Sequence, residues 1–166
     1  GIIAGRRDLI AKLKRNPMTR AMRPDKITLA ALQAVLSLYT DPARLAVELP
    51  TLRWLSRDVA EIEQLAGRLV TAVQDRCKGF AVVIAPAQSQ VGSGALPIAR
   101  LPSAALKVTL PDQRRPGKAL NRLARTFRDL PVPVIGRITD DALWFDLRCL
   151  EDEHGFVENL RGLSVV

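Results

Sequence analysis

The chain has 166 residues, of which 48% are apolar and 25% are charged, and its 25 Lys and Arg residues outnumber its 17 Asp and Glu residues. This composition is typical of a globular chain and excludes a disordered tail and a glycine-periodic collagen. No stretch approaches the roughly 20 apolar residues of a membrane helix, and no charged segment with an apolar core opens the chain as a signal peptide would. We therefore expect a cytoplasmic protein. Because the chain begins at Gly1 on an apolar run rather than at Met, we also expect it to start within a larger protein.

The positive charge is concentrated at the amino-terminal end. Residues 1–26 carry eight bases and two acids, a net charge of +6 out of the +8 of the whole chain. The eight bases are Arg6, Arg7, Lys12, Lys14, Arg15, Arg20, Arg23 and Lys26. So localised a charge indicates either a surface for phosphate-bearing partners or an ordinary solvated helix face.

Helical patterns dominate the first 57 residues. The predicted elements are, in chain order, a helix over 6–15, a loop over 16–24, a helix over 25–39 with Asp25 as its N-cap, and a short helix over 41–47 that Pro50 ends. The helix over 25–39 is apolar on most sides, so we expect it to be buried against several neighbours. No strand pattern occurs in this part of the chain.

The remaining residues alternate between strand and helix patterns. The predicted elements are a helix over 58–75, strands over 80–85 and 105–110, a helix over 117–130, strands over 134–139 and 142–149, and a last helix over 153–163. Asp140-Asp141 lies between two apolar runs and indicates a hairpin turn. This order predicts an α+β layer in which helices cover one face of an antiparallel sheet.

The usual catalytic and metal-binding patterns are missing. Cys77, Cys149 and the single His154 are too few and too scattered for a zinc site, a disulfide framework or a Ser/His/Asp set, so no metal site is expected. We expect both cysteines to be small buried hydrophobes and His154 to be exposed near a helix start. Gly92-Ser93-Gly94 is too short for a phosphate-binding loop and is interpreted as a turn.

The pair Arg20 and Arg23 is the strongest chemical signal. Two arginines three apart, between Pro17 and Pro24, can turn their planar guanidinium groups to one side and clamp a phosphate or carboxylate. The alternative is a surface pair that makes incidental salt bridges. Spacing alone does not decide between them.

Several stretches of the chain resemble the sequences of one known family. They are Gly1 to Pro17, Arg20-Ala-Met-Arg23-Pro-Asp-Lys, Leu49-Pro-Thr-Leu-Arg53, Gln90 to Pro97, Leu101 to Leu106, Val134 to Ile138, and Asp146-Leu-Arg148. Together they closely resemble bacterial selenocysteine synthase, the L-seryl-tRNA(Sec) selenium transferase family. The first block is the most specific, and the likeness extends over essentially the whole chain.

The resemblance implies a fold and a reaction. Members are fold-type-I enzymes that depend on pyridoxal 5′-phosphate, so the overall class is α/β. Residues 1–57 then correspond to the tail end of the large cofactor domain with connecting helices, and residues 58–166 to a small C-terminal α+β domain with an antiparallel sheet. The reaction eliminates water from seryl-tRNA(Sec) and adds selenium from selenophosphate. The lysine that carries the cofactor is expected just upstream of Gly1, so no cofactor-binding residue is assigned here and the isolated chain is expected to be inactive.

The resemblance also assigns residues and partners. Arg20 and Arg23 match two active-site arginines of the family, which implies that they hold selenophosphate or phosphates near the tRNA end and stabilise the departing phosphate. Lys118, Arg122 and Arg125 form a basic helix face that is either a contact for the tRNA acceptor arm or a solvated surface. The family also implies a homo-oligomer without membrane attachment.

Two alternatives remain open. A related enzyme that uses pyridoxal phosphate on another substrate would share the arginine pair. A basic module that binds RNA without catalysis would share the charge. An in-frame Ser-Gly-Asp-Lys stretch upstream of Gly1 would favour an enzyme, and a start codon there would exclude it.

Overall fold

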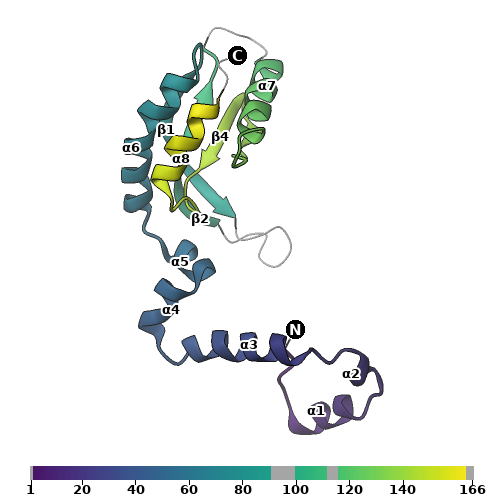
Figure 1. Cartoon of the computed structure of the whole chain (residues 1–166). Helices are drawn as coiled ribbons and strands as arrows, with labels where there is room; N and C mark the ends of the chain where they lie inside the picture. Colours follow the sequence, from purple (N-terminus) through teal and green to yellow (C-terminus); the bar gives the residue numbers. More distant parts are fainter. Residues whose placement is uncertain (1, 91–99, 112–115, 164–166) are drawn as a thin grey trace. The chain divides into compact units, whose positions relative to one another are not determined.

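The computed structural model describes residues 2–90, 100–111 and 116–163. The chain divides into two compact units, Gly1–Leu52 and Arg53–Val166, which are described separately (Figure 1). The division falls a few residues before the predicted boundary at 57/58. That the first unit is the tail end of a large cofactor domain stays a prediction.

The first unit is built from short helices. They are α1 (Arg7–Lys14), α2 (Met18–Ala21), α3 (Lys26–Leu38) and α4 (Pro42–Glu48), and α5 (Pro50–Ser56) crosses into the second unit. The predicted loop over 16–24 therefore contains one short helix. Pro50 follows the end of α4, as predicted, but it also begins α5, because the first turn of a helix needs no N–H from its first residue.

Helix α3 is not buried, contrary to the prediction. Its N-cap Asp25 accepts a hydrogen bond from the Thr28 main-chain N–H at 2.9 Å, as expected, but none of its residues is buried. Large apolar side chains such as Leu29, Leu36 and Tyr39 are exposed. The helix is apolar on most sides, as predicted, but the described residues of this unit provide no second layer to cover it.

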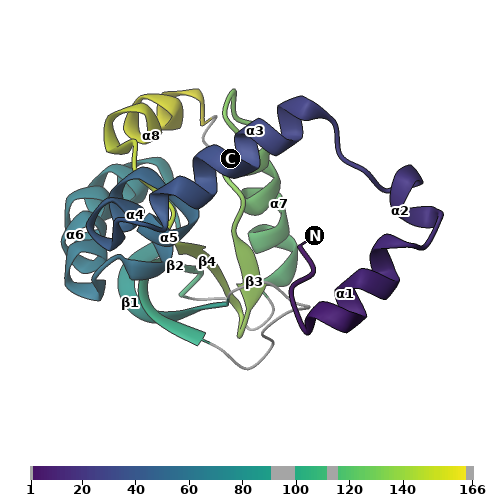
Figure 2. The same ribbon diagram turned by 90° about the horizontal axis from the view of Figure 1, so that it is seen from below.

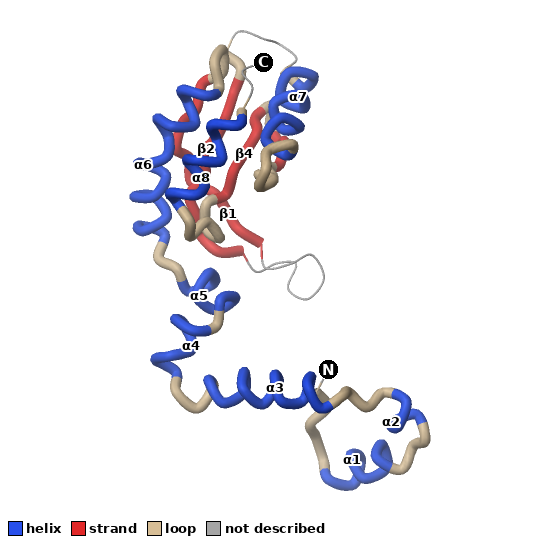
Figure 3. The backbone as a smooth tube through the Cα atoms, in the orientation of Figure 1, coloured by secondary structure: helices blue, strands red, loops and turns tan. Residues whose placement is uncertain are grey.

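The second unit is an α+β layer, as predicted. Its elements are α6 (Val59–Arg76), β1 (Ala81–Gln90), β2 (Arg100–Thr109), α7 (Gly117–Arg128), β3 (Arg137–Thr139), β4 (Ala142–Asp146), α8 (Glu153–Asn159) and the 3-10 turn η1 (Leu160–Gly162). The strands pair antiparallel in the order β1-β2-β4-β3. Helices α6, α7 and α8 lie on one face of this sheet (Figures 2 and 3).

The core of this unit lies between the helices and the sheet. The buried stripe of α6 comprises Ile62, Leu65, Ala66, Leu69 and Val73. Helix α7 contributes Leu120, Leu123 and Phe127, and the Phe127 ring packs on that of Phe145 in β4 with centroids 4.6 Å apart. Each fully buried apolar side chain of this size contributes about 1.5–3 kcal/mol to stability. The two helices predicted over 58–75 and 117–130 thus each bury an apolar face against the sheet.

The hairpin is confirmed in position and corrected in length. Asp140 and Asp141 both have positive φ, 50° and 52°, as a tight turn between two strands requires. Strands β3 and β4 are shorter than predicted, and β4 ends at Asp146. Cys149 therefore lies beyond the strand and is exposed, so the prediction that it is buried was wrong, whereas Cys77 is buried at the end of α6.

Candidate functional site

Arg20 and Arg23 lie on either side of the end of α2. The helix is started by Asn16, whose side-chain oxygen accepts from the Met18 main-chain N–H at 2.9 Å. Arg20 occupies its last turn, and Arg23 follows in a segment without regular structure before Pro24, where helical backbone is disfavoured. Both arginines are exposed.

The two acids of residues 1–26, Asp8 and Asp25, are engaged by other partners. Asp8 pairs with the Arg6 guanidinium through contacts of 2.6 Å and 3.0 Å, and this lowers the pKa of Asp8. Asp25 accepts from the main-chain N–H and the hydroxyl of Thr28, each at 2.9 Å, and these bonds lower its pKa. Within the described residues neither Arg20 nor Arg23 has an ion-pair partner. The pair is therefore available for an external anion.

Pyridoxal phosphate does not fit the described residues of the first unit. A Schiff-base lysine needs an ε-amino group shielded from water, and the cofactor ring needs apolar and acidic neighbours. None of the described residues 2–52 is buried. We therefore derive no catalytic step through the cofactor from this chain alone.

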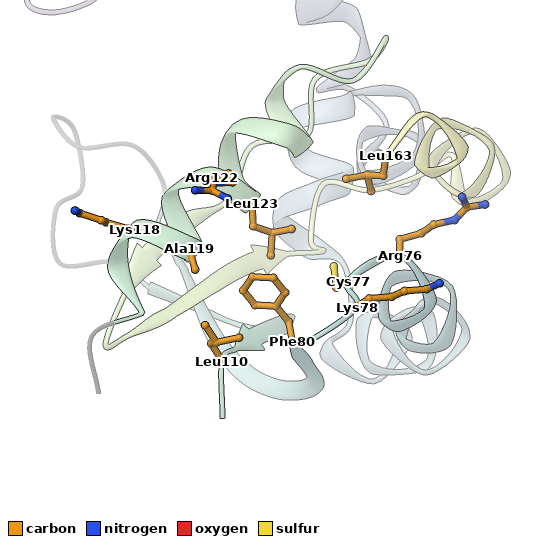
Figure 4. A pocket seen from close by; sticks show the side chains of 11 residues that line it. Arg76, Cys77, Lys78, Phe80, Leu110, Lys118, Ala119, Arg122, Leu123 and Leu163 are labelled. Carbon is orange, nitrogen blue, oxygen red and sulfur yellow. The ribbon is translucent and has the colours of Figure 1, made fainter. Parts of the chain in front are cut away.

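The three basic residues predicted on one face of α7 have different surroundings. Lys118 and Arg122 line a cavity of about 400 Å³, shown in Figure 4. Arg125 does not line it and instead lies 3.7 Å from Asp129, one turn further along the helix. The structure thus brings two of the three predicted residues together.

Two bases at this cavity were not singled out from the sequence. Arg76 is the last residue of α6 and Lys78 follows in the turn before β1, and both line the same cavity as Lys118 and Arg122. Some 40 residues separate the two pairs in the sequence. The signal available was two bases directly after an amphipathic helix, which is too common to identify a site.

Most carboxylates of the second unit stabilise structure. Glu151 accepts from Arg53 at 2.5 Å and 2.8 Å and from the indole N–H of Trp54 at 2.8 Å. Glu153 pairs with Arg68 at 2.9 Å, and Asp152 caps α8 by accepting from the Gly155 N–H at 2.8 Å. His154 is exposed in the first turn of α8, as predicted.

No metal site and no membrane-spanning helix is seen in the described part of the chain. Across residues 2–90, 100–111 and 116–163, no group of three or more His, Cys, Asp and Glu side chains could hold a metal ion. No helix in these ranges is both long and apolar enough to cross a bilayer. The turn predicted at Gly92-Ser93-Gly94 lies outside the described residues.

The features above describe an α/β chain that presents unpaired basic side chains to solvent. The family model for L-seryl-tRNA selenium transferase (SelA) matches residues 1–151. The chain therefore belongs to the L-seryl-tRNA selenium transferase family.

Individual relatives agree with this assignment. The chain is 55% identical over 160 residues to the L-seryl-tRNA(Sec) selenium transferase of Klebsiella pneumoniae, a match that covers 96% of this chain and 34% of the relative. It is 52% identical over 161 residues to the protein of the same name from Escherichia fergusonii and 53% identical to that from Shigella flexneri, with the same coverage. The chain thus spans about a third of the length of these relatives.

Proposed function

We propose that this chain is the C-terminal part of a cytoplasmic, homo-oligomeric enzyme that converts seryl-tRNA(Sec) to selenocysteinyl-tRNA(Sec) with selenophosphate. Support comes from the 55% identity, over 96% of the chain, to the L-seryl-tRNA(Sec) selenium transferase of Klebsiella pneumoniae. The proposal includes a fold-type-I architecture, with pyridoxal phosphate bound to a lysine outside these 166 residues. When bound, that cofactor would supply the electron sink for loss of water from the seryl group.

Arg20 and Arg23 carry the part of the proposal that concerns this chain. A serine esterified to tRNA has no free α-carboxylate, so these arginines are available for phosphate groups. We assign them to hold the phosphate of selenophosphate, or phosphates near the tRNA end, and to stabilise the departing phosphate. The supporting observation is that both acids of residues 1–26 are held by other partners, Asp8 by Arg6 and Asp25 by Thr28. A charge-assisted hydrogen bond to phosphate is about twice as strong as a neutral one.

The exposed face of α3 fits a chain that packs against more protein. Ile27, Leu32 and Val35 are exposed, and the relatives are about three times as long as this chain. We propose that the remaining part of the full-length protein covers this face. The chain alone is then expected to have no transferase activity.

A chimera tests the proposed function. The matching third of the Klebsiella pneumoniae relative would be replaced by this chain, and formation of selenocysteinyl-tRNA(Sec) from seryl-tRNA(Sec) and selenophosphate would be measured. Activity within about tenfold of the parent enzyme supports the transferase. A folded chimera that binds tRNA without selenium transfer would instead support a non-catalytic RNA-binding module.

The DNA upstream of Gly1 provides an independent check. An in-frame Ser-Gly-Asp-Lys stretch is expected there if the chain continues an enzyme of this kind. A related enzyme with another substrate would pass this check and fail the chimera assay.

A further inference from the structure

The cavity between α6 and α7 has an apolar floor. Phe80, Leu110, Leu123 and Leu163 line it (Figure 4). Phe80 is half-buried just before β1. Its backbone is fixed by Gln74, whose side-chain N–H donates to the Phe80 carbonyl at 2.9 Å and whose oxygen accepts from the Val82 N–H at 2.8 Å. The main chain that carries the Phe80 ring is therefore fixed at this end of the cavity.

Basic side chains stand on two sides of this floor. Lys118 and Arg122 extend to one side, and Arg76 and Lys78 extend to the other (Figure 4). Among the described residues that line the cavity there is no Asp or Glu. Within the described part of the chain, none of these four bases has an ion-pair partner, although Arg68, Arg125 and Arg161 of the same unit are each paired. The cavity thus concentrates uncompensated positive charge around an apolar surface.

We propose that this cavity binds an unpaired nucleotide of RNA. The base lies against Phe80, and the phosphates on its two sides contact Lys118 and Arg122 on one edge and Arg76 and Lys78 on the other. Stacking of a base on an aromatic ring between basic side chains is the usual way in which proteins bind single-stranded RNA. A volume of about 400 Å³ also accommodates a group the size of a nucleotide.

The arrangement favours RNA over an acidic protein segment. The carboxylates of an acidic segment would pair with the four basic side chains but would leave the apolar floor of Phe80, Leu110 and Leu123 uncovered. A nucleotide within an RNA strand can contact both the floor and the basic side chains, because its planar base covers the floor and a phosphate lies on each side of its sugar. The inference rests on the proposed function for the choice of RNA, since the names of the relatives include a tRNA. It adds a site in the second unit, separate in sequence from Arg20 and Arg23.

The test uses the 166-residue chain and a fluorescein-labelled oligouridylate of about ten nucleotides. Anisotropy titrations from about 50 to about 200 mM KCl give the affinity and its salt dependence. Lys78→Ala and Arg122→Ala are each expected to weaken binding severalfold and to reduce the slope of log K against log salt by about 0.7, the value for one lost phosphate contact on a single strand. Phe80→Leu is expected to weaken binding about fivefold or more with the slope unchanged, because it removes stacking only.

Arg125→Ala is the matched control. It removes the same charge from α7 but lies outside the cavity and pairs with Asp129, so it should change binding by less than about twofold. Thermal unfolding of each variant checks the fold. Because Lys78 is exposed, Lys78→Ala should fold and still test the proposal if Phe80→Leu is unstable. The proposal is overturned if the chain does not bind the oligonucleotide, or if Lys78→Ala and Arg122→Ala have no more effect than Arg125→Ala. Because this assay needs no selenium transfer, its failure with an active chimera would reject only the nucleotide site.

Discussion

Arg57 and Arg148 each donate a hydrogen bond from the guanidinium group to the main-chain carbonyl of the other, at 3.1 Å and 3.0 Å. Arg57 also donates to the Leu150 carbonyl at 2.7 Å. Arg148 also donates to the carbonyls of Trp54, at 2.8 Å, and Pro102. These bonds fix the segment before α6 to β2 and to the loop after β4. Asp146-Leu-Arg148, part of the family resemblance, thus has a structural role in this unit.

Replacing Arg148 should destabilise the second unit strongly. The residue is only 5% exposed, and Arg148→Ala leaves several carbonyls without their donor, at about 1–3 kcal/mol for each that stays buried. We expect a loss of about 3 kcal/mol or more in the free energy of unfolding from urea titrations. Arg125→Ala, the exposed control, should change it by less than about 0.5 kcal/mol. Equal effects of the two substitutions would contradict the role assigned to Arg148.

Glu151 should make stability depend on acid pH. Hydrogen bonds, first from Arg53 and then from Trp54, hold the pKa of Glu151 below its ordinary value of 4.5. A carboxyl with a lowered folded-state pKa contributes stability above its unfolded pKa and loses it as the pH falls through the folded value. Below about pH 4.5, stability of the native chain should therefore fall more steeply than that of Glu151→Gln. Glu63→Gln, at an exposed position without an ion pair, is the control and should keep the native pH profile.

Asp141→Gly should stabilise the hairpin. Asp141 has φ of 52°, a left-handed backbone that glycine adopts without strain. We expect a gain of about 0.5–1 kcal/mol in the free energy of unfolding. Asp129→Gly, at a position with φ of −82°, should show no gain. A loss of stability in Asp141→Gly would argue against this turn geometry.

The two cysteines should differ in reactivity. Burial raises the pKa of Cys77 to about 11. Partial burial, followed by the charge of Asp146, also raises the pKa of Cys149, but the Cys149 side chain is exposed to a reagent. Because the thiolate is the reactive form, a thiol reagent at about pH 8 should label Cys149 in the native chain and both cysteines in urea. Mass spectrometry of digested, labelled protein locates each adduct. Rapid native labelling of Cys77 would show that the end of α6 is open.

Periodicity was sufficient to predict the longer helices and the general form of the sheet, but not the short helices α2 and α5. The helix over 58–75 was predictable because the spacing of its apolar residues is a local property. The structure adds its N-cap, Asp58, which accepts from the Ala60 N–H at 3.0 Å. The strands β1 and β2 extend beyond the predicted ranges 80–85 and 105–110, and the added residues include Pro86 and Pro102. Proline is tolerated where a strand has a free edge. β1 is an edge strand, and β2 pairs with β4 only over Ala105–Val108, which leaves Pro102 outside that pairing.

The candidate sites were only partly predictable. Arg20 and Arg23 are close in sequence, so their spacing alone could identify them as candidate site residues. The four basic side chains of the cavity come from two segments that are brought together only because α6 and α7 lie on the same face of the sheet. Cys149 was misplaced because the end of β4 depends on its pairing with β2 and β3, which no local pattern specifies.

The steady-state kinetics of selenium transfer in the chimera, at saturating seryl-tRNA(Sec), test the central claim most directly. If Arg20 and Arg23 hold the phosphate of selenophosphate, Arg20→Ala and Arg23→Ala should each lower kcat/KM for selenophosphate by about tenfold or more, the loss expected for a charge-assisted hydrogen bond. Arg15→Ala, an exposed base of the same segment, should leave it within about twofold, and all three variants should unfold at the parent temperature. A kcat/KM that is unchanged in Arg20→Ala and Arg23→Ala, or reduced as much by Arg15→Ala, would contradict the assignment.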